Sequence, residues 1–223
     1  MKSKATYHHG DLRRALLKAG ESVLREHGLG KFTLRECARR AGVSHAAPKH
    51  HFGDVRGLLT ELAAGGFERL TLLLRLQIAT ATNLNEEFAA ANRAYLQFAM
   101  ENTEHFRIMF RADLVDETSP VLRAASNGTF LELTNVIHRQ RGEAEIVASP
   151  SGNPLPLRGV IDDIIIGWSH VHGFTHLLLE QQLDMVDVTE YDSLLDKAAR
   201  RLPDILQREA QLAKRNDTLQ VGD

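Results

Sequence analysis

Two short helices in close succession are specified by local signals near the start of the chain. Thr33 and Glu36 have the spacing of a capping box, in which each side chain satisfies a free backbone N–H at the first turn of a helix. Gly42 stands where a left-handed residue would end that helix, and Ser44 is typical of a residue that caps the next one, over 45–51. A helix, a tight glycine turn and a second helix form the helix-turn-helix pattern.

A longer helix precedes this pair, over 11–27, and ends at Gly28. Its apolar residues recur at intervals of three or four and therefore share one face: Leu12, Leu16, Ala19 and Val23. Pro48 conflicts with the helix predicted over 45–51, because a proline at the fourth helical position removes a backbone hydrogen bond. We therefore expect that helix to be short and distorted at its start.

The charge is divided unevenly along the chain. Residues 1–60 carry 12 Lys and Arg against 5 Asp and Glu, a net charge of +7, whereas the remainder carries 15 against 24, a net charge of −9. This asymmetry predicts a basic module that binds phosphates and an acidic module that does not. A cationic membrane-surface helix is the competing interpretation, but it needs a broad apolar face without partners. We place the boundary between a basic helix-turn-helix domain, 1–56, and a second domain, 57–223.

Residues 7–60 resemble the N-terminal domain of TetR-type transcriptional regulators, in the run TLRECARRAGVSHAAPKHHFGDVRGLL and in the preceding YHHGDLRRALLKAG. The resemblance implies phosphate contacts from Thr33, Lys49 and His51. It implies that Ser44, His45 and Ala46 lie near the edges of bases.

Two departures from the family pattern concern the phosphate contacts. Lys49 stands where the family usually has tyrosine. Val55 stands where a phosphate-binding lysine is common, with Arg56 one place later. The start of the fourth helix therefore lacks its usual lysine.

The chemistry of these side chains agrees with an interface to duplex DNA. His45 can bond to a purine edge, Ala46 can meet a thymine methyl group, and Lys49 can hold a phosphate. For the histidines, the alternative is an exposed surface that titrates and has no partner. The DNA-binding candidates are Thr33, Ser44, His45, Ala46, Lys49, His50 and His51.

The rest of the chain is also predicted to be helical, and no long stretch alternates with the period of a strand. An all-α protein is expected, with further helices over 54–79, 85–102, 103–111, 119–141, 159–182 and 188–208. The stretch from Gly142 to Pro156 is predicted to be a loop. Gly65 and Gly66, inside the first of these helices, either allow close packing of a neighbour or mark a soft point between the modules.

The last two helices have more apolar surface than one subunit can cover. The helix over 159–182 is apolar on nearly all sides, and the helix over 188–208 has one apolar stripe. This pattern predicts a homodimer that pairs these helices in a four-helix bundle.

Trp168, His172 and Gly173, in the order W-x-x-x-H-G, resemble the mark of one C-terminal domain class of TetR-type regulators, as does YLQFAMENTEHFRIMF. This resemblance implies a helical domain that binds a small-molecule effector and forms the dimer. Aromatic, Met and His residues on predicted inward faces are the candidates for its pocket, and a packed core is the alternative. These candidates are Tyr95, Phe98, Phe106, Met109, Phe110, Trp168 and His172.

An enzyme is the alternative class. His172, His176 and Glu180 share one helix face, which suits a divalent metal in a helical hydrolase or oxidase. The paired Glu-x-x-His motifs of di-iron bundles are missing, and Cys37 is the single cysteine. We therefore expect no metal, cofactor or catalysis, and a cytoplasmic, ligand-responsive repressor that binds a pseudo-palindromic operator as a dimer.

Overall fold

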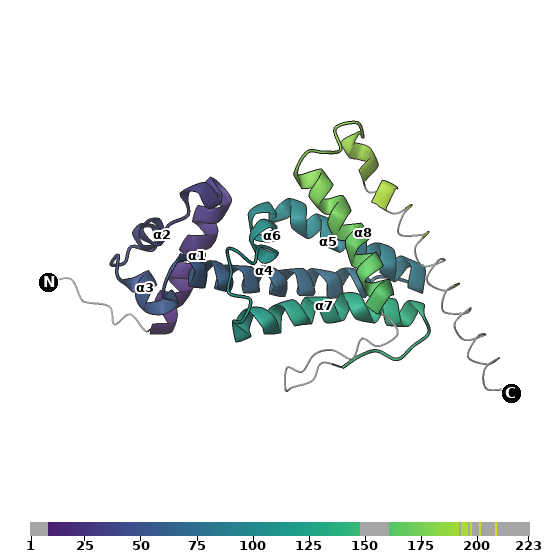
Figure 1. The fold of residues 1–223 in the computed structure, drawn as a ribbon, viewed down its shortest axis with the longest axis horizontal. Coiled ribbons are helices and arrows are strands. Elements are labelled where there is room, and N and C mark those ends of the chain that lie inside the picture. Colours follow the sequence, from purple (N-terminus) through teal and green to yellow (C-terminus); the bar gives the residue numbers. More distant parts are fainter. Residues whose placement is uncertain are drawn as a thin grey trace. The chain divides into compact units, whose positions relative to one another are not determined.

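The computed structural model describes residues 9–147 and 161–191 and, beyond them, 193–195, 197, 201 and 208. Every regular element in this described part is a helix, and it contains no strand, so the predicted all-α class is confirmed (Figure 1). The elements are α1 (His9–His27), η1 (Leu29–Lys31), α2 (Leu34–Ala41), α3 (Ala47–Phe52), α4 (Val55–Ile78), α5 (Leu84–Glu101), α6 (Thr103–Met109), α7 (Pro120–Gln140), α8 (Ile161–Leu179) and η2 (Val188–Glu190).

The Thr33 cap and the Gly42 stop act as the sequence predicts, but the Glu36 half of the capping box does not, because its carboxylate accepts from Arg39 and Arg40. Thr33 is the N-cap, and its Oγ1 accepts a hydrogen bond of 3.2 Å from the backbone N–H of Glu36. Gly42 ends the helix in the left-handed region, with φ 67° and ψ 33°. α2 packs against both α1 and α3, and its buried Cys37 and Ala38 join the predicted apolar face of α1 in one small core.

The expectation for the start of α3 was wrong. The helix begins at Ala47 rather than at residue 45, and Ala46, not Ser44, is its N-cap, with no side-chain hydrogen bond. Pro48 consequently lies in the first turn of the helix. Backbone nitrogens there donate no intrahelical hydrogen bond, so proline loses none, and its fixed φ suits the helix. The conflict at Pro48 is resolved by a later start of α3.

The junction between α3 and α4 is tight and depends on Gly57. An added Cβ at this residue would lie 1.9 Å from the backbone oxygen of Phe52, so only glycine fits. The N–H of Gly57 donates to Asp54 Oδ1 at 2.8 Å, which satisfies one of the free donors at the start of α4. α4 is thereby fixed in direction directly after α3.

The chain forms two compact units. The first combines residues up to Phe67 with Asn102–Ser126, and the second combines Glu68–Glu101 with the residues from Asn127 onward. α4 contributes to both units.

Within the first unit, α6 packs on the N-terminal part of α4. A Cβ added to Gly66 would lie 2.6 Å from Met109 Sδ, and the rings of Phe67 and Phe110 meet edge to face at 5.4 Å. Gly66 therefore serves close packing, which is one of the two roles considered for the glycine pair.

Within the second unit, α8 lies across α5 and packs against it (Figure 1). Its inward residues Ile164, Gly167 and Val171 are buried, whereas its outward face carries exposed apolar side chains. In the described part of the chain, no helix is both long and apolar enough to cross a membrane. Most of the loop predicted over 142–156 and of the helix over 188–208 lies outside the described residues.

Candidate nucleic-acid interface

Six of the seven predicted DNA-binding residues are exposed: Thr33, Ser44, His45, Ala46, Lys49 and His50. Ser44, His45 and Ala46 form the turn between α2 and α3, whereas Lys49 and His50 lie within α3. His51 is half-buried, with its ring 6.2 Å from that of the buried Phe52.

This surface is available for a ligand. In the described part of the chain no hydrogen bond or ion pair engages the side chains of His45, Lys49 or His50. α3 is short, carries exposed cationic side chains and follows an exposed turn with small side chains. These features match the recognition helix of helix-turn-helix proteins, which enters a major groove.

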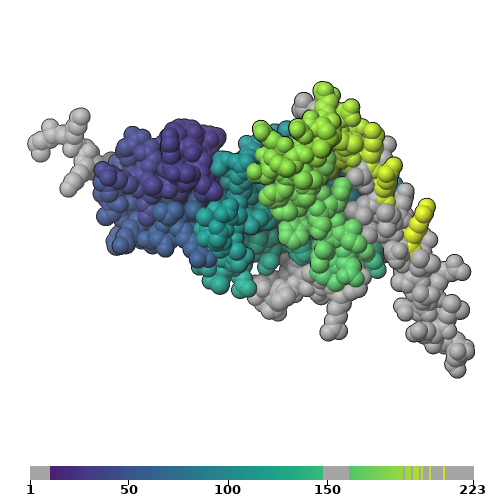
Figure 2. Space-filling view, turned by 45° about the horizontal axis from the view of Figure 1, so that its top comes forward, coloured from purple at the N-terminus to yellow at the C-terminus, as the bar shows by residue number. Residues whose placement is uncertain are grey.

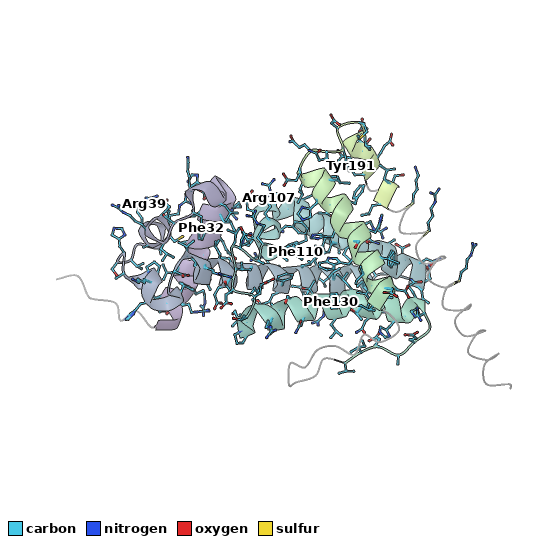
Figure 3. All side chains as sticks on the ribbon, in the orientation of Figure 1. Phe32, Arg39, Arg107, Phe110, Phe130 and Tyr191 are labelled. Carbon is cyan, nitrogen blue, oxygen red and sulfur yellow. The ribbon has the colours of Figure 1, made fainter. Side chains whose placement is uncertain are left out.

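Two arginines of α2 contribute to the positive charge of this region but are neutralised locally. Arg39 Nε and Nη2 donate to the two oxygens of Glu36, each at 2.7 Å, and Arg40 Nε donates to Oε1 at 3.0 Å. The hydrogen bonds from Arg39, followed by those from Arg40, lower the pKa of Glu36 to about 2. Arg39 lies at the edge of the first unit (Figure 3), yet its guanidinium is hydrogen-bonded to the carboxylate of Glu36.

Arg40 instead holds α2 onto α1. Its Nη1 donates to Ser22 Oγ and to Glu26 Oε2, both at 2.7 Å, and its Nη2 lies 2.8 Å from His27 Nε2. The hydrogen bond from Ser22, followed by that from Arg40, lowers the pKa of Glu26. Because the guanidinium reaches three residues of α1, it fixes the position of the helix-turn-helix on its supporting helix.

Arg13 and Arg56 are likewise occupied within the first unit. Arg13 pairs with Glu61 at 2.6 Å and lies over the ring of Phe52, 5.6 Å from its centre. Arg56 donates to the backbone oxygens of Ala112 and Val115. Arg56, one place after the position of the missing lysine, thus has a structural role in the first unit.

Lys31 and Arg35 were overlooked at the sequence level. Both are exposed on either side of Thr33, and no ion pair or hydrogen bond to either side chain occurs among the described residues. Their nearness in sequence to Thr33 is the signal that identifies them as further phosphate-binding candidates.

The second unit contains a cavity of about 30 Å³ between α5, α7 and α8. Its lining is almost entirely apolar and comprises Phe88, Ala91, Asn92, Phe130, Leu133, Val136, Ile137, Ile164, Gly167, Trp168 and Val171. Phe130 lies where α7 passes α8 (Figure 3), and its ring meets that of Trp168 edge to face at 6.3 Å.

Three of the predicted pocket residues meet beside this cavity. The hydroxyl of the buried Tyr95 lies 2.7 Å from His172 Nδ1, and Trp168 Nε1 donates to the same hydroxyl at 3.5 Å. Burial raises the pKa of Tyr95. Burial and the nearby His176 lower the pKa of His172 to about 4, so the ring is neutral at pH 7 and shares one hydrogen bond with the Tyr95 hydroxyl through Nδ1.

The remaining pocket candidates lie elsewhere. Phe98 is buried on α5 in the second unit, whereas Phe106, Met109 and Phe110 belong to the first unit. Phe88, Asn92, Phe130 and Gly167 line the cavity but were not predicted. The sequence signal that could have indicated Asn92 is its polar side chain within the apolar inner face of α5.

The residues of the metal-enzyme alternative are near one another on α8. The rings of His172 and His176 are 4.5 Å apart. Among the described residues, however, no group of three His, Cys, Asp or Glu side chains is arranged to hold a metal ion.

Known proteins resemble the chain in sequence and in fold. The family described as "Bacterial regulatory proteins, tetR family" matches residues 16–62, and "Tetracyclin repressor-like, C-terminal domain" matches residues 88–202. No curated protein matches the chain.

Among solved structures, a protein of unknown function from Rhodococcus sp. RHA1 is 29% identical, with a TM-score of 0.69 over 89% of this chain and 98% of that one. A TetR family transcription regulator from Marinobacter aquaeolei VT8 is 17% identical, with a TM-score of 0.57 over 86% and 94%. The fatty acid degradation regulator FadR from Bacillus halodurans is 14% identical, with a TM-score of 0.58 over 92% and 97%.

The C-terminal match covers more than half of the chain, the N-terminal match covers the helix-turn-helix, and the whole fold is that of solved TetR regulators. The chain is therefore a member of the TetR family of bacterial transcriptional regulators, with an N-terminal DNA-binding domain of that family.

Proposed function

We propose that the protein is a ligand-responsive repressor that binds a pseudo-palindromic operator as a homodimer in the cytoplasm and has no catalytic step. The observation that carries this proposal is the exposed surface of Ser44, His45, Ala46, Lys49 and His50, which is joined to α1 through Arg40.

The proposed mode of DNA binding divides this surface between two tasks. Lys49 and Thr33 hold phosphates and set the position of α3, while His45 and Ala46 meet base edges in the major groove. In a dimer, two copies of α3 would enter successive major grooves about one helical turn, ~34–36 Å, apart. We keep residues 1–56 as the proposed DNA-binding domain and 57–223 as the effector and dimerisation domain.

The outer face of α8 supports the proposed dimer. Ile161, Ile165, Ile166 and Leu177 are between 39% and 51% exposed, and Figure 2 shows α8 at the surface of its unit. Because such a row of large apolar side chains is unfavourable in water, it favours burial against a second copy. The helix predicted over 188–208 is the proposed second element of that interface.

The cavity beside Trp168 supports the proposed effector site. A ligand that binds more tightly to the form that does not bind DNA would shift the dimer toward that form and release the operator.

Sedimentation and gel-shift measurements test the proposed assembly. The wild-type protein is expected to sediment as a dimer and to bind a duplex as two chains. Ile166→Glu is expected to yield monomers with much weaker duplex binding, because it places a charge within the interface. Leu72→Glu is the matched control, since Leu72 is a similarly exposed apolar residue on α4, and it should remain dimeric. A monomeric wild-type protein, or no affinity for any duplex at low salt, would refute the proposal.

A further inference from the structure

The cavity in the second unit has a closed side and a mouth. Phe130, Leu133 and Trp168 are half-exposed, whereas the other lining residues are buried. The mouth therefore lies between α7 and α8, and the interior extends toward α5. The rings of Phe130 and Trp168, 6.3 Å apart, lie at this mouth.

The lining of this cavity excludes a charged ligand. Phe88, Ala91, Ile137 and the other lining residues provide no ionisable side chain. The neighbouring His172 is neutral at pH 7, because burial lowers its pKa to about 4. A carboxylate or phosphate in this cavity would lose its hydration without gaining a counter-charge.

Asn92 is the one side-chain amide in the lining, and its nitrogen makes a hydrogen bond within the protein. It is 4% exposed, and its Nδ2 donates to the backbone oxygen of Phe88 at 3.0 Å. Its Oδ1 has no hydrogen-bond partner among the described residues. An acceptor in the lining without a protein partner is suited to a donor on a ligand.

Gly167 limits the size of the cavity beside Ile137 and Phe88. A Cβ added there would lie 3.4 Å from Ile137 Cδ1 and 3.8 Å from Phe88 Cε2, which is contact distance without a severe clash. The added methyl group would therefore occupy cavity space while the fold persists.

From these observations we propose that the cavity binds a small, uncharged, mainly apolar molecule with one hydroxyl or N–H donor, of which phenol is the simplest aromatic example, and that Asn92 Oδ1 accepts its hydrogen bond. The proposal deepens the effector role and rests on it. At about 30 Å³ the cavity holds roughly two water molecules, and a benzene ring needs about 150 Å³. A ring would therefore have to displace Phe130 or Trp168 at the mouth.

Three probes that share one ring test this proposal on the full-length protein without DNA. Phenol has the ring and a donor, toluene has the ring without a donor, and benzoate has the ring with a charge. Calorimetry measures the affinities, and Trp168, the only tryptophan, reports occupation of the cavity by its fluorescence. We expect phenol to bind roughly three- to tenfold more tightly than toluene, the effect of one hydrogen bond, and benzoate not to bind.

Two variants locate the binding. Asn92→Leu should abolish the preference for phenol and bind toluene at least as tightly, because it keeps the volume but leaves the phenol hydroxyl without water or an acceptor. Gly167→Ala should weaken both, whereas the control Gly128→Ala, on α7 and outside the lining, should bind as the wild type does. If Asn92→Leu does not fold, the affinities of the three probes for the wild type and for Gly167→Ala still test the ligand class and its site.

The outcomes that overturn the inference differ from those that overturn the proposed function. Benzoate binding as tightly as phenol, or a phenol preference that survives in Asn92→Leu, refutes the ligand class. Absence of probe binding together with a more stable Gly167→Ala identifies a packing void and also refutes it. Duplex binding is measured separately without probe, so its loss would refute the DNA-binding role and leave the ligand class standing.

Discussion

Arg56 Nη2 donates a hydrogen bond of 2.7 Å to the backbone oxygen of Val115, a residue that is 2% exposed. The segment before α7 is also held by Thr60, whose Oγ1 accepts from the N–H of Asp116 at 2.9 Å. The first turns of α4 therefore hold this segment through three hydrogen bonds, two from Arg56 and one to Thr60.

Arg56→Ala is expected to lower the free energy of unfolding by about 1–2 kcal/mol, because the buried oxygen of Val115 loses a charged donor. Chemical denaturation measures the change, with Arg14→Ala, at an exposed position of α1, as a control near zero. The slope of duplex affinity against salt should be unchanged. A shallower slope for Arg56→Ala would mean that the side chain binds phosphate after all.

Lys49→Ala and His45→Ala are expected to differ in kind. Removing the Lys49 charge should weaken binding to all duplexes and reduce the salt slope by about 1, since one phosphate contact is lost. Removing the His45 ring should relax preference at one base position by about 1–3 kcal/mol. Gel-shift titrations across salt concentrations and operator variants separate the two effects, and identical behaviour of the variants would contradict this division.

Gly57→Ala is expected to destabilise the protein by at least about 1–3 kcal/mol, because its Cβ would lie 1.9 Å from the backbone oxygen of Phe52. The displaced α3–α4 junction should also weaken DNA binding. Thermal unfolding measures the stability. Gly30→Ala is the matched control, since a Cβ there meets nothing within 4 Å. Equal melting temperatures for the two variants would refute the close approach.

The ion pairs of Glu36 predict a dependence of stability on acid. The pKa of Glu36 falls from 4.5 to about 2 on folding, so the ionised Glu36 carboxylate stabilises the folded state. This stabilisation is complete above pH 4.5 and is lost as the pH falls toward 2. Glu36→Gln lacks the titration, so the difference in melting temperature between wild type and variant should shrink over that range. A constant difference would show that Arg39 and Arg40 do not act through the charge of Glu36.

The helix-turn-helix could be predicted from the sequence because its signals are local. Thr33 caps α2 through an N–H three residues away, and Gly42 ends the helix by its own backbone conformation. The start of α3 was misplaced because Ser44 resembles a cap, whereas the helix begins at Ala47 and so places Pro48 in its first turn.

The cavity between α5, α7 and α8 could not be predicted in the same way. It depends on contacts between α5, α7 and α8, which are distant in sequence, and an inward aromatic residue gives the same pattern whether it lines a cavity or fills a core. Trp168, Tyr95 and His172 were identified as neighbours of the site, but Asn92 and Gly167 required the packed structure. The structural role of Arg56 could not be predicted either, because its partners at Ala112 and Val115 lie more than fifty residues later.

Selection of bound fragments from a random pool of duplexes tests the central claim most directly. Enrichment of a palindrome whose half-sites are about one helical turn apart is predicted, since two α3 helices would read it together. Recovery of unrelated sequences with equal affinity would contradict the account.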